Sequence, residues 1–189
     1  MSVLQAIILG IVQGLTEFLP VSSSGHLAIM KNLLRVNTDT GILFDILLHV
    51  ATLISICIVM YKDIIRLFFE FITLIADLFA NLKLLFVNMG TNGSKKKYRQ
   101  LVTNSYRKFV ILVVLSTIPT GILGILLKDM VERVEESLLV PGICLIMTGF
   151  ILLLSDHIEE GNKKPKDANW GDALVIGASQ GVAALPGLS

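Results

Sequence analysis

Apolar residues form long runs along this chain, and short polar segments separate them. A helix that spans a membrane needs roughly 20 mostly apolar residues. Three runs, 41–61, 109–127 and 138–154, meet that requirement, and polar or charged residues flank each of them. Pro119 lies inside the second run, which predicts a kink whose freed carbonyl groups must find partners on neighbouring helices.

The segment 64–87 between the first two runs has a different pattern. Its polar residues recur at steps of four, three, four and four, which places them in one stripe along a helix. The stripe consists of Arg66, Glu70, Thr73, Asp77 and Asn81. We favour a helix that lies in the membrane interface with this stripe toward water over a fourth spanning helix.

Basic residues gather in the loop 88–108 and indicate its side of the membrane. They are Lys95, Lys96, Lys97, Arg99, Arg107 and Lys108. Because loops rich in lysine and arginine stay on the cytoplasmic side, we expect this loop to be cytoplasmic. The loop around 31–40 is then expected outside, and the lysine-containing segment 156–169 inside.

The two remaining segments, 1–30 and 170–189, resemble each other. "GIVQGLTEFLPVSS" and "GASQGVAALPGLS" share Gly, Gln, Gly, Leu, Pro and Ser in the same order. Three predicted spans separate the copies, so they would enter the membrane from opposite sides, as in an inverted-topology repeat with re-entrant, broken helices. Residues 1–155 would form the first repeat and 170–189 would begin the second; chance similarity is the alternative.

Composition agrees with a single membrane domain over 1–189. Apolar residues make up 53% of the chain and charged residues 16%, and the mean hydropathy is +0.75. The expected fold class is therefore an all-α integral membrane protein. The basic residues lie in connecting segments rather than on one surface, so we expect no nucleic-acid partner. No basic residue precedes Lys31, so a signal peptide is not expected and the N-terminus is expected to be retained.

Gln13 and Glu17 are the first candidates for chemistry, because they lie four residues apart on one face of an apolar helix. A carboxylate inside a membrane segment is costly unless it faces a wet cavity or a cation. Glu17 is therefore a candidate ligand for a cation. Alternatively it is a capping or interfacial carboxylate, and Gln13 makes only an interhelical hydrogen bond.

Pro20 ends this helix and opens a polar turn, "VSSSGH". The turn holds Ser22, Ser23, Ser24, Gly25 and His26, which offer hydroxyl groups, an adaptable backbone and an imidazole. Backbone N–H groups in such a turn, at the start of the next helix, can bind an anion. One serine is expected to cap that helix in any case, and His26 alone could be structural.

Asp45 and His49 lie four residues apart and are the strongly polar groups in the run 41–61. They could support the same site from a second layer around it, or form an ion pair of their own within the helix bundle.

The string "QGLTEFLPVSSSGHL" resembles the first signature of the undecaprenyl-diphosphatase (bacitracin-resistance) family. "FDILLHVATLISICIVMYKD" resembles the family's next helix, and "QGVAALPGLS" resembles the start of its second signature. The resemblance implies a multi-pass enzyme of the bacterial plasma membrane that removes the terminal phosphate of undecaprenyl diphosphate. This reaction recycles a polyprenyl lipid carrier for cell-wall peptidoglycan synthesis and underlies bacitracin resistance. The resemblance also implies inverted repeats, a homodimer and a divalent cation, Mg²⁺ or Ca²⁺.

The resemblance further implies residue roles. Glu17, with Gln13, would bind the cation and position the diphosphate; Ser23 would be a nucleophile and His26 a proton carrier or an alternative nucleophile. Phosphate would contact the remaining turn residues and those of the second copy: Ser22, Ser24, Gly25, Pro186, Gly187 and Ser189. On this topology the first turn opens to the outside.

One departure from the family pattern is clear. The second signature continues into an arginine and further helices in the family, whereas this sequence stops at Ser189. We therefore expect a fragment or a short member of the family, which could be inactive. A transporter or lipid flippase with inverted repeats is the alternative function. The chain lacks the Lys, Arg-Pro and Ser-Arg motifs of the acid-phosphatase-like lipid phosphatases.

Overall fold

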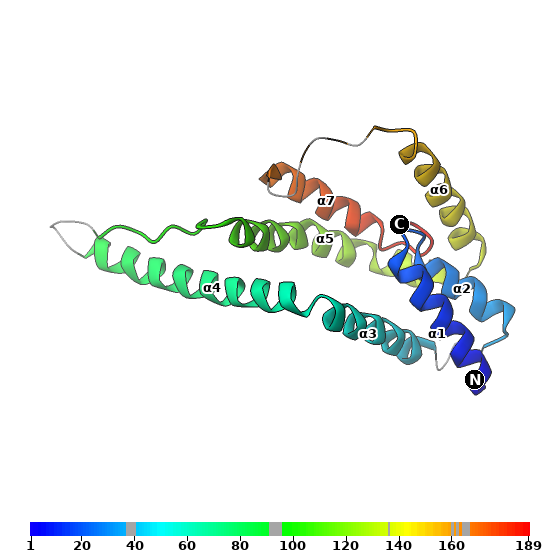
Figure 1. The fold of residues 1–189 in the computed structure, drawn as a ribbon. Coiled ribbons are helices and arrows are strands. Elements are labelled where there is room, and N and C mark those ends of the chain that lie inside the picture. The colour runs from blue at the N-terminus through cyan, green and yellow to red at the C-terminus, as the bar shows by residue number, and fades with distance from the viewer. Residues whose placement is uncertain (37–40, 91–95, 136, 160, 162, 164–166) are drawn as a thin grey trace.

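The computed structural model describes the chain except residues 37–40, 91–95, 136, 160, 162 and 164–166. The described residues form helices and no strands, which confirms the all-helical prediction. In chain order the helices are α1 (Val3–Phe18), α2 (Ser23–Leu33), α3 (Gly41–Val59), α4 (Tyr61–Met89), α5 (Ser105–Glu135), α6 (Leu139–Ser155) and α7 (Trp170–Val182). Figure 1 shows α1, α2 and the C-terminus gathered at one end, with α4 extending away from them.

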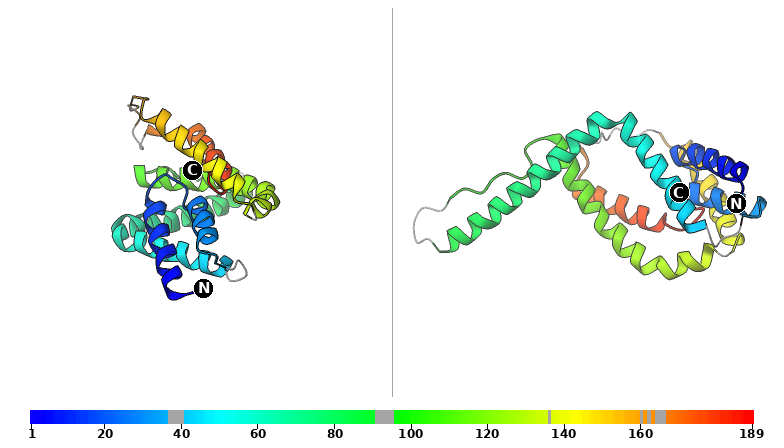
Figure 2. Two further views of the ribbon diagram at one scale, coloured as in Figure 1. Left: turned by 90° about the vertical axis from the view of Figure 1, so that its right-hand side faces the viewer. Right: turned by 90° about the horizontal axis from the view of Figure 1, so that it is seen from below.

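The runs 109–127 and 138–154 coincide with parts of α5 and α6, whereas the run 41–61 passes the break at Met60, where α3 ends and α4 begins. The helices also differ in their ability to span a membrane. The segment Ser105–Val131 of α5 is long and apolar enough to cross by itself. Leu43–Val59 and Tyr61–Met89 pass the same test only as a pair, and they are bent by 93° at their junction. The right-hand view of Figure 2 shows this bend. Helix α6 is apolar but shorter. Crossing by α3 and α6 therefore stays a prediction.

The two segments that resemble each other also begin their helices alike. Ser2 caps α1 and Gln5 reaches back to the backbone of Ser2; Asn169 and Asp172 do the same for α7. Such capping boxes satisfy N–H groups that have no partner inside the helix. Each helix then ends shortly before a proline-containing turn.

Helix α7 packs closely against α5, the helix that contains Pro119. A Cβ atom added to Gly177 would lie 2.1 Å from the carbonyl oxygen of Ser116 and 2.7 Å from Cγ of Pro119. Thr120 donates its hydroxyl to the carbonyl oxygens of both Ser116 (2.9 Å) and Gly177 (2.7 Å). The chain continues helically through Pro119, and α5 is curved rather than broken (Figure 2).

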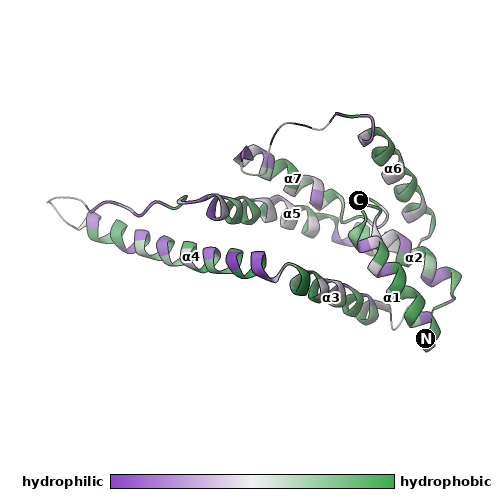
Figure 3. Cartoon of the chain, in the orientation of Figure 1, coloured by the Kyte–Doolittle hydropathy of each residue, from purple (hydrophilic) through white to green (hydrophobic). Residues whose placement is uncertain are grey.

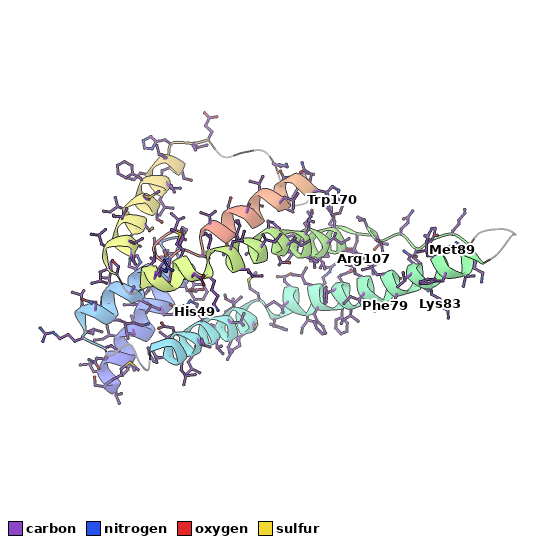
Figure 4. The ribbon with its side chains drawn as sticks, turned by 180° about the vertical axis from the view of Figure 1, so that it is seen from behind. His49, Phe79, Lys83, Met89, Arg107 and Trp170 are labelled. Carbon is purple, nitrogen blue, oxygen red and sulfur yellow. The ribbon has the colours of Figure 1, made fainter. Side chains whose placement is uncertain are left out.

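The polar stripe of α4 contacts the chain that returns from the basic loop, a partner that the sequence pattern does not predict. Arg66 and Thr73 are still exposed, and the position of the stripe in the membrane interface stays a prediction. Arg107 donates to Glu70 (3.2 Å), Asp77 (2.7 Å) and Thr73 (2.7 Å), and it lies between α4 and α5 in Figure 4. Both Asn81 and Asn88 exchange two hydrogen bonds with backbone groups of the returning chain. The stripe residues and Asn88 form these contacts because they lie along one face of α4, opposite hydrogen-bonding groups of residues 96–107.

Two arginines also hold Asp77 in its charged form. Hydrogen bonds from the Arg99 and Arg107 guanidinium groups keep the pKa of the Asp77 carboxyl below its ordinary value of 3.8. Arg66 completes the set by stacking on the Tyr106 ring, 3.6 Å from its centre. We call α4 together with the returning residues 96–104 the arm.

Candidate active site

The first polar turn takes its shape from the end of α1. Helix α1 ends at Phe18, Leu19 is extended, and Pro20 cannot donate a backbone hydrogen bond. Ser22 caps α2 with φ = 63° and ψ = 95°, a conformation that few residues other than glycine adopt. The bend brings the start of α2 back beside the last turn of α1.

Glu17 is the centre of the contacts that result. Its Oε2 atom accepts a hydrogen bond from the Ser23 hydroxyl at 2.6 Å and another from the Gln13 side-chain amide at 2.8 Å. Nε2 of His49 lies 4.0 Å from the same oxygen, close enough for an ion pair when the imidazole is protonated. The structure thus brings together three of the predicted residues around one carboxylate.

The three consecutive serines have different surroundings. Ser22 is 6% exposed, and its hydroxyl caps α2 by accepting from the Gly25 N–H. Ser23 is half-buried and bonded to Glu17, whereas Ser24 is exposed and lies 3.3 Å from the Ser22 hydroxyl. The N-cap role that was expected for one serine belongs to Ser22.

His26 is oriented by the same turn. Its Nδ1 atom lies 2.8 Å from the carbonyl oxygen of Ser22, and a carbonyl can only accept, so Nδ1 carries the proton. In the neutral ring Nε2 then has a free lone pair, which can take or pass a proton. Among the described residues no hydrogen bond or ion pair joins His26 to Glu17; each of them contacts a serine of the turn.

The second turn meets the first one. Gly187, at φ = 93°, donates its N–H to the Ser22 hydroxyl at 3.1 Å. Pro186 and Gly187 are buried, and Ser189 is exposed, with its N–H bonded to Thr148. The two similar segments therefore come together through their turns, as Figure 1 shows at the C-terminus.

Asp45 and His49 have different side-chain partners. Asp45 forms an ion pair with Lys31 of α2, while His49 points Nδ1 to the carbonyl oxygen of Asp45 at 2.8 Å and Nε2 toward Glu17. Figure 4 labels His49 on α3, and α1 also packs on this helix. His49 lies beside the predicted site, and Asp45 links α2 to α3.

Gln13 and Glu17 supply oxygen atoms that could hold a divalent cation only together with ligands from outside these two side chains. Among the described residues no group of three or more His, Cys, Asp and Glu side chains could hold a metal by itself. Gln13 is 1% exposed, and its Oε1 atom has no hydrogen-bond partner. An amide oxygen beside one carboxylate suits Mg²⁺ or Ca²⁺, because these ions take oxygen ligands and Mg²⁺ is commonly completed by phosphate and water.

Comparison with known proteins identifies the family. The family model described as "Bacitracin resistance protein BacA" matches residues 6–189. The chain belongs to the BacA family. It is 44% identical to the undecaprenyl-diphosphatase of Alkaliphilus metalliredigens and 41% identical to that of Methanosphaera stadtmanae. Both alignments cover the whole chain and 63% of the relative, so the chain spans about 63% of the length of these BacA relatives.

Two residues at this BacA site were missed by the sequence reasoning. The sequence pattern places Lys31 only at the start of a loop, yet Lys31 forms an ion pair with Asp45. The sequence pattern places Thr148 only within an apolar run, yet it is 2% exposed and its hydroxyl bonds to the Gly187 carbonyl and the Ser189 N–H of the second turn. A lone hydroxyl inside "CLIMTGFI" was the available signal, because a buried polar group needs partners.

Proposed function

We propose that the protein is a membrane phosphatase that hydrolyses undecaprenyl diphosphate to undecaprenyl phosphate and phosphate. The observation that carries this proposal is the 2.6 Å hydrogen bond from the Ser23 hydroxyl to Glu17, inside a proline-ended polar turn of an apolar helix. A hydroxyl whose proton already points to a carboxylate is an activated nucleophile. The names of the relatives support the choice of substrate.

The reaction proceeds in two steps in this proposal. The Ser23 oxygen attacks the terminal phosphorus, its proton passes to Glu17, and the bond from phosphorus to the bridging oxygen breaks to release undecaprenyl phosphate. Water then attacks the phosphoserine and gives a proton to His26 at Nε2. The serine oxygen leaves the phosphorus, regains its proton from Glu17, and phosphate is released.

Charge neutralisation is the other requirement, since phosphoryl transfer depends mainly on positioning and on stabilising negative charge. Ser24 and the N–H groups at the start of α2 would contact the phosphate, and Ser189 would approach it from the second turn. A Mg²⁺ or Ca²⁺ ion held by Glu17 and the Gln13 oxygen would offset the diphosphate charge. His49 would orient Glu17 from the side of α3.

The membrane arrangement belongs to the same proposal. Similar capping boxes, proline-containing turns and the contact between the turns support an inverted-topology repeat with two re-entrant segments. The basic loop would lie in the cytoplasm and the first turn would open to the outside of the bacterial plasma membrane. Assembly as a homodimer is supported by the family resemblance alone.

Phosphate release from undecaprenyl diphosphate by the protein in lipid vesicles tests the function, with Glu17→Gln as the variant. We expect release to fall about 100-fold or more, because an acid–base group contributes 10²–10⁴. Glu159→Gln is the matched control: the same change at an exposed residue should leave the rate unaltered. Movement of the lipid across the vesicle membrane without phosphate release would instead identify a transporter.

A further inference from the structure

The two polar turns are joined by contacts that leave almost no space between their backbones. A Cβ atom added to Gly25 would lie 2.6 Å from Cα and 3.0 Å from the nitrogen of Gly187. One added to Gly187 would lie 2.3 Å from the carbonyl oxygen of Pro141 on α6. Only glycine fits at these positions, so the second turn lies against both α2 and α6.

Thr148 of α6 fixes the second turn from the other side. Its hydroxyl donates to the carbonyl oxygen of Gly187 at 2.8 Å and accepts from the N–H of Ser189 at 3.1 Å. Thr148 is 2% exposed, and a buried hydroxyl in an apolar helix would be costly without partners. Here its proton and one of its lone pairs both serve hydrogen bonds to the second turn. Both of these hydrogen bonds of the Thr148 hydroxyl therefore stabilise the second turn.

Ser22 completes the arrangement from the first turn. Its hydroxyl oxygen receives N–H groups from Gly187 (3.1 Å) and Gly25 (3.4 Å) and lies beside the Ser24 hydroxyl. With these neighbours and 6% exposure, the Ser22 oxygen has little capacity left for a ligand. Gly187 is thus held on both sides: its N–H by Ser22 and its carbonyl by Thr148.

We propose that Thr148 and Ser22 are positioning residues that lock the second turn onto the first. This Ser22–Gly187–Thr148 clasp fixes where Ser189 lies relative to Ser23 and Ser24. In this proposal Ser22 joins the two turns and does not contact phosphate. Only the statement about phosphate rests on the proposed function. The clasp itself involves no substrate and can be measured without one.

Amide hydrogen exchange of Gly187 and Ser189, followed by NMR on the protein in lipid nanodiscs, tests the clasp. In Thr148→Val, which replaces the hydroxyl with a methyl group, we expect both amides to exchange about three to ten times faster, as loss of one or two hydrogen bonds implies. Thr148→Ser keeps the hydroxyl and should restore wild-type exchange. Thr117→Val is the matched control, because among the described residues the Thr117 hydroxyl bonds within its own helix, to Val114.

Unchanged exchange in Thr148→Val, or failure of Thr148→Ser to restore it, would overturn the proposal. If Thr148→Val does not fold, Ser22→Ala decides: faster exchange at Gly187 supports the clasp, and wild-type exchange refutes it. Phosphate release is measured in parallel. If the wild-type protein releases no phosphate but exchange is faster in Thr148→Val, the clasp is supported and the proposed function is contradicted. If the wild-type protein releases phosphate but exchange is unchanged in Thr148→Val, the proposed function stands and the clasp is refuted.

Discussion

At the residue scale, the three adjacent serines have separate tasks although the sequence presents them as equivalent. Ser22 is the cap, with φ = 63° outside the regular helix, and its hydroxyl meets the second turn. Ser23 and Ser24 are successive positions of α2, where one step turns the side chain by about 100°, so Ser23 meets Glu17 and Ser24 stays exposed. The local run predicts a polar turn with one helix cap, but the partner of each hydroxyl depends on elements that come from elsewhere in the chain.

Ser23→Ala should separate the nucleophile from its neighbours. Because Ser23→Ala removes the hydroxyl that donates to Glu17, we expect phosphate release to fall about 100-fold or more. Ser24→Ala removes one phosphate contact, and we expect a loss of about tenfold. Initial rates on undecaprenyl diphosphate measure both effects. Ser55→Ala serves as the control, since within the part of the chain that the structure describes its hydroxyl bonds to Ala51 of its own helix. Equal losses for Ser23 and Ser24 would argue against Ser23 as nucleophile.

At the element scale, the contact of α7 with α5 positions the second turn. Gly177 and Gly181 allow the two helices to approach, since a Cβ atom at Gly181 would lie 2.6 Å from Cβ of Leu123. Small residues four apart permit such close packing in membranes. In the sequence these glycines are only members of a repeated pattern; their packing role depends on which helix α7 meets.

Gly177→Ala should push α7 away from α5, because the atom it would meet at 2.1 Å is a backbone oxygen that cannot move aside. We expect a loss of about 1–3 kcal/mol, as for other overpacked sites. Thermal unfolding in detergent measures the change. Gly121→Ala on α5 is the matched control: no atom lies within 4 Å of its added Cβ, so stability should be kept or slightly raised. Similar losses in both variants would contradict this packing.

At the scale of the whole molecule, the arm extends from the bundle with two unlike faces. Figure 3 shows polar and apolar residues alternating along α4. One face binds the returning chain, and the opposite face presents apolar side chains that are 47–68% exposed: Ile65, Phe68, Ile72, Phe79, Leu82 and Phe86. The returning residues 96–104 are not helical, and backbone outside a helix needs water or other partners. We therefore predict that the arm lies in the membrane interface, with its phenyl groups toward lipid.

Depth of the arm can be measured with a single fluorophore. Trp170 is the one tryptophan, so Trp170→Phe provides a background for Phe79→Trp. We expect quenching to be strongest with lipids brominated near the headgroup, because an interfacial helix enters only about 5–10 Å. Lys97→Trp, on the returning chain, should be quenched little, and Ile146→Trp on α6 should be quenched near the bilayer centre. Strongest quenching of the Phe79→Trp variant at the bilayer centre would mean that the arm spans.

The sequence alone determined that the chain is helical, where its apolar helices lie, and which turn carries the candidate chemistry. Those features depend on residues close together in the chain, through helical periodicity, proline and local hydrogen bonding. Tertiary structure decided that the stripe of α4 binds Arg107, that Lys31 meets Asp45, and that Ser22 meets Gly187 across 165 residues. Such pairs could not be predicted because a buried hydroxyl or charge requires a partner, but only the packing of helices selects which one.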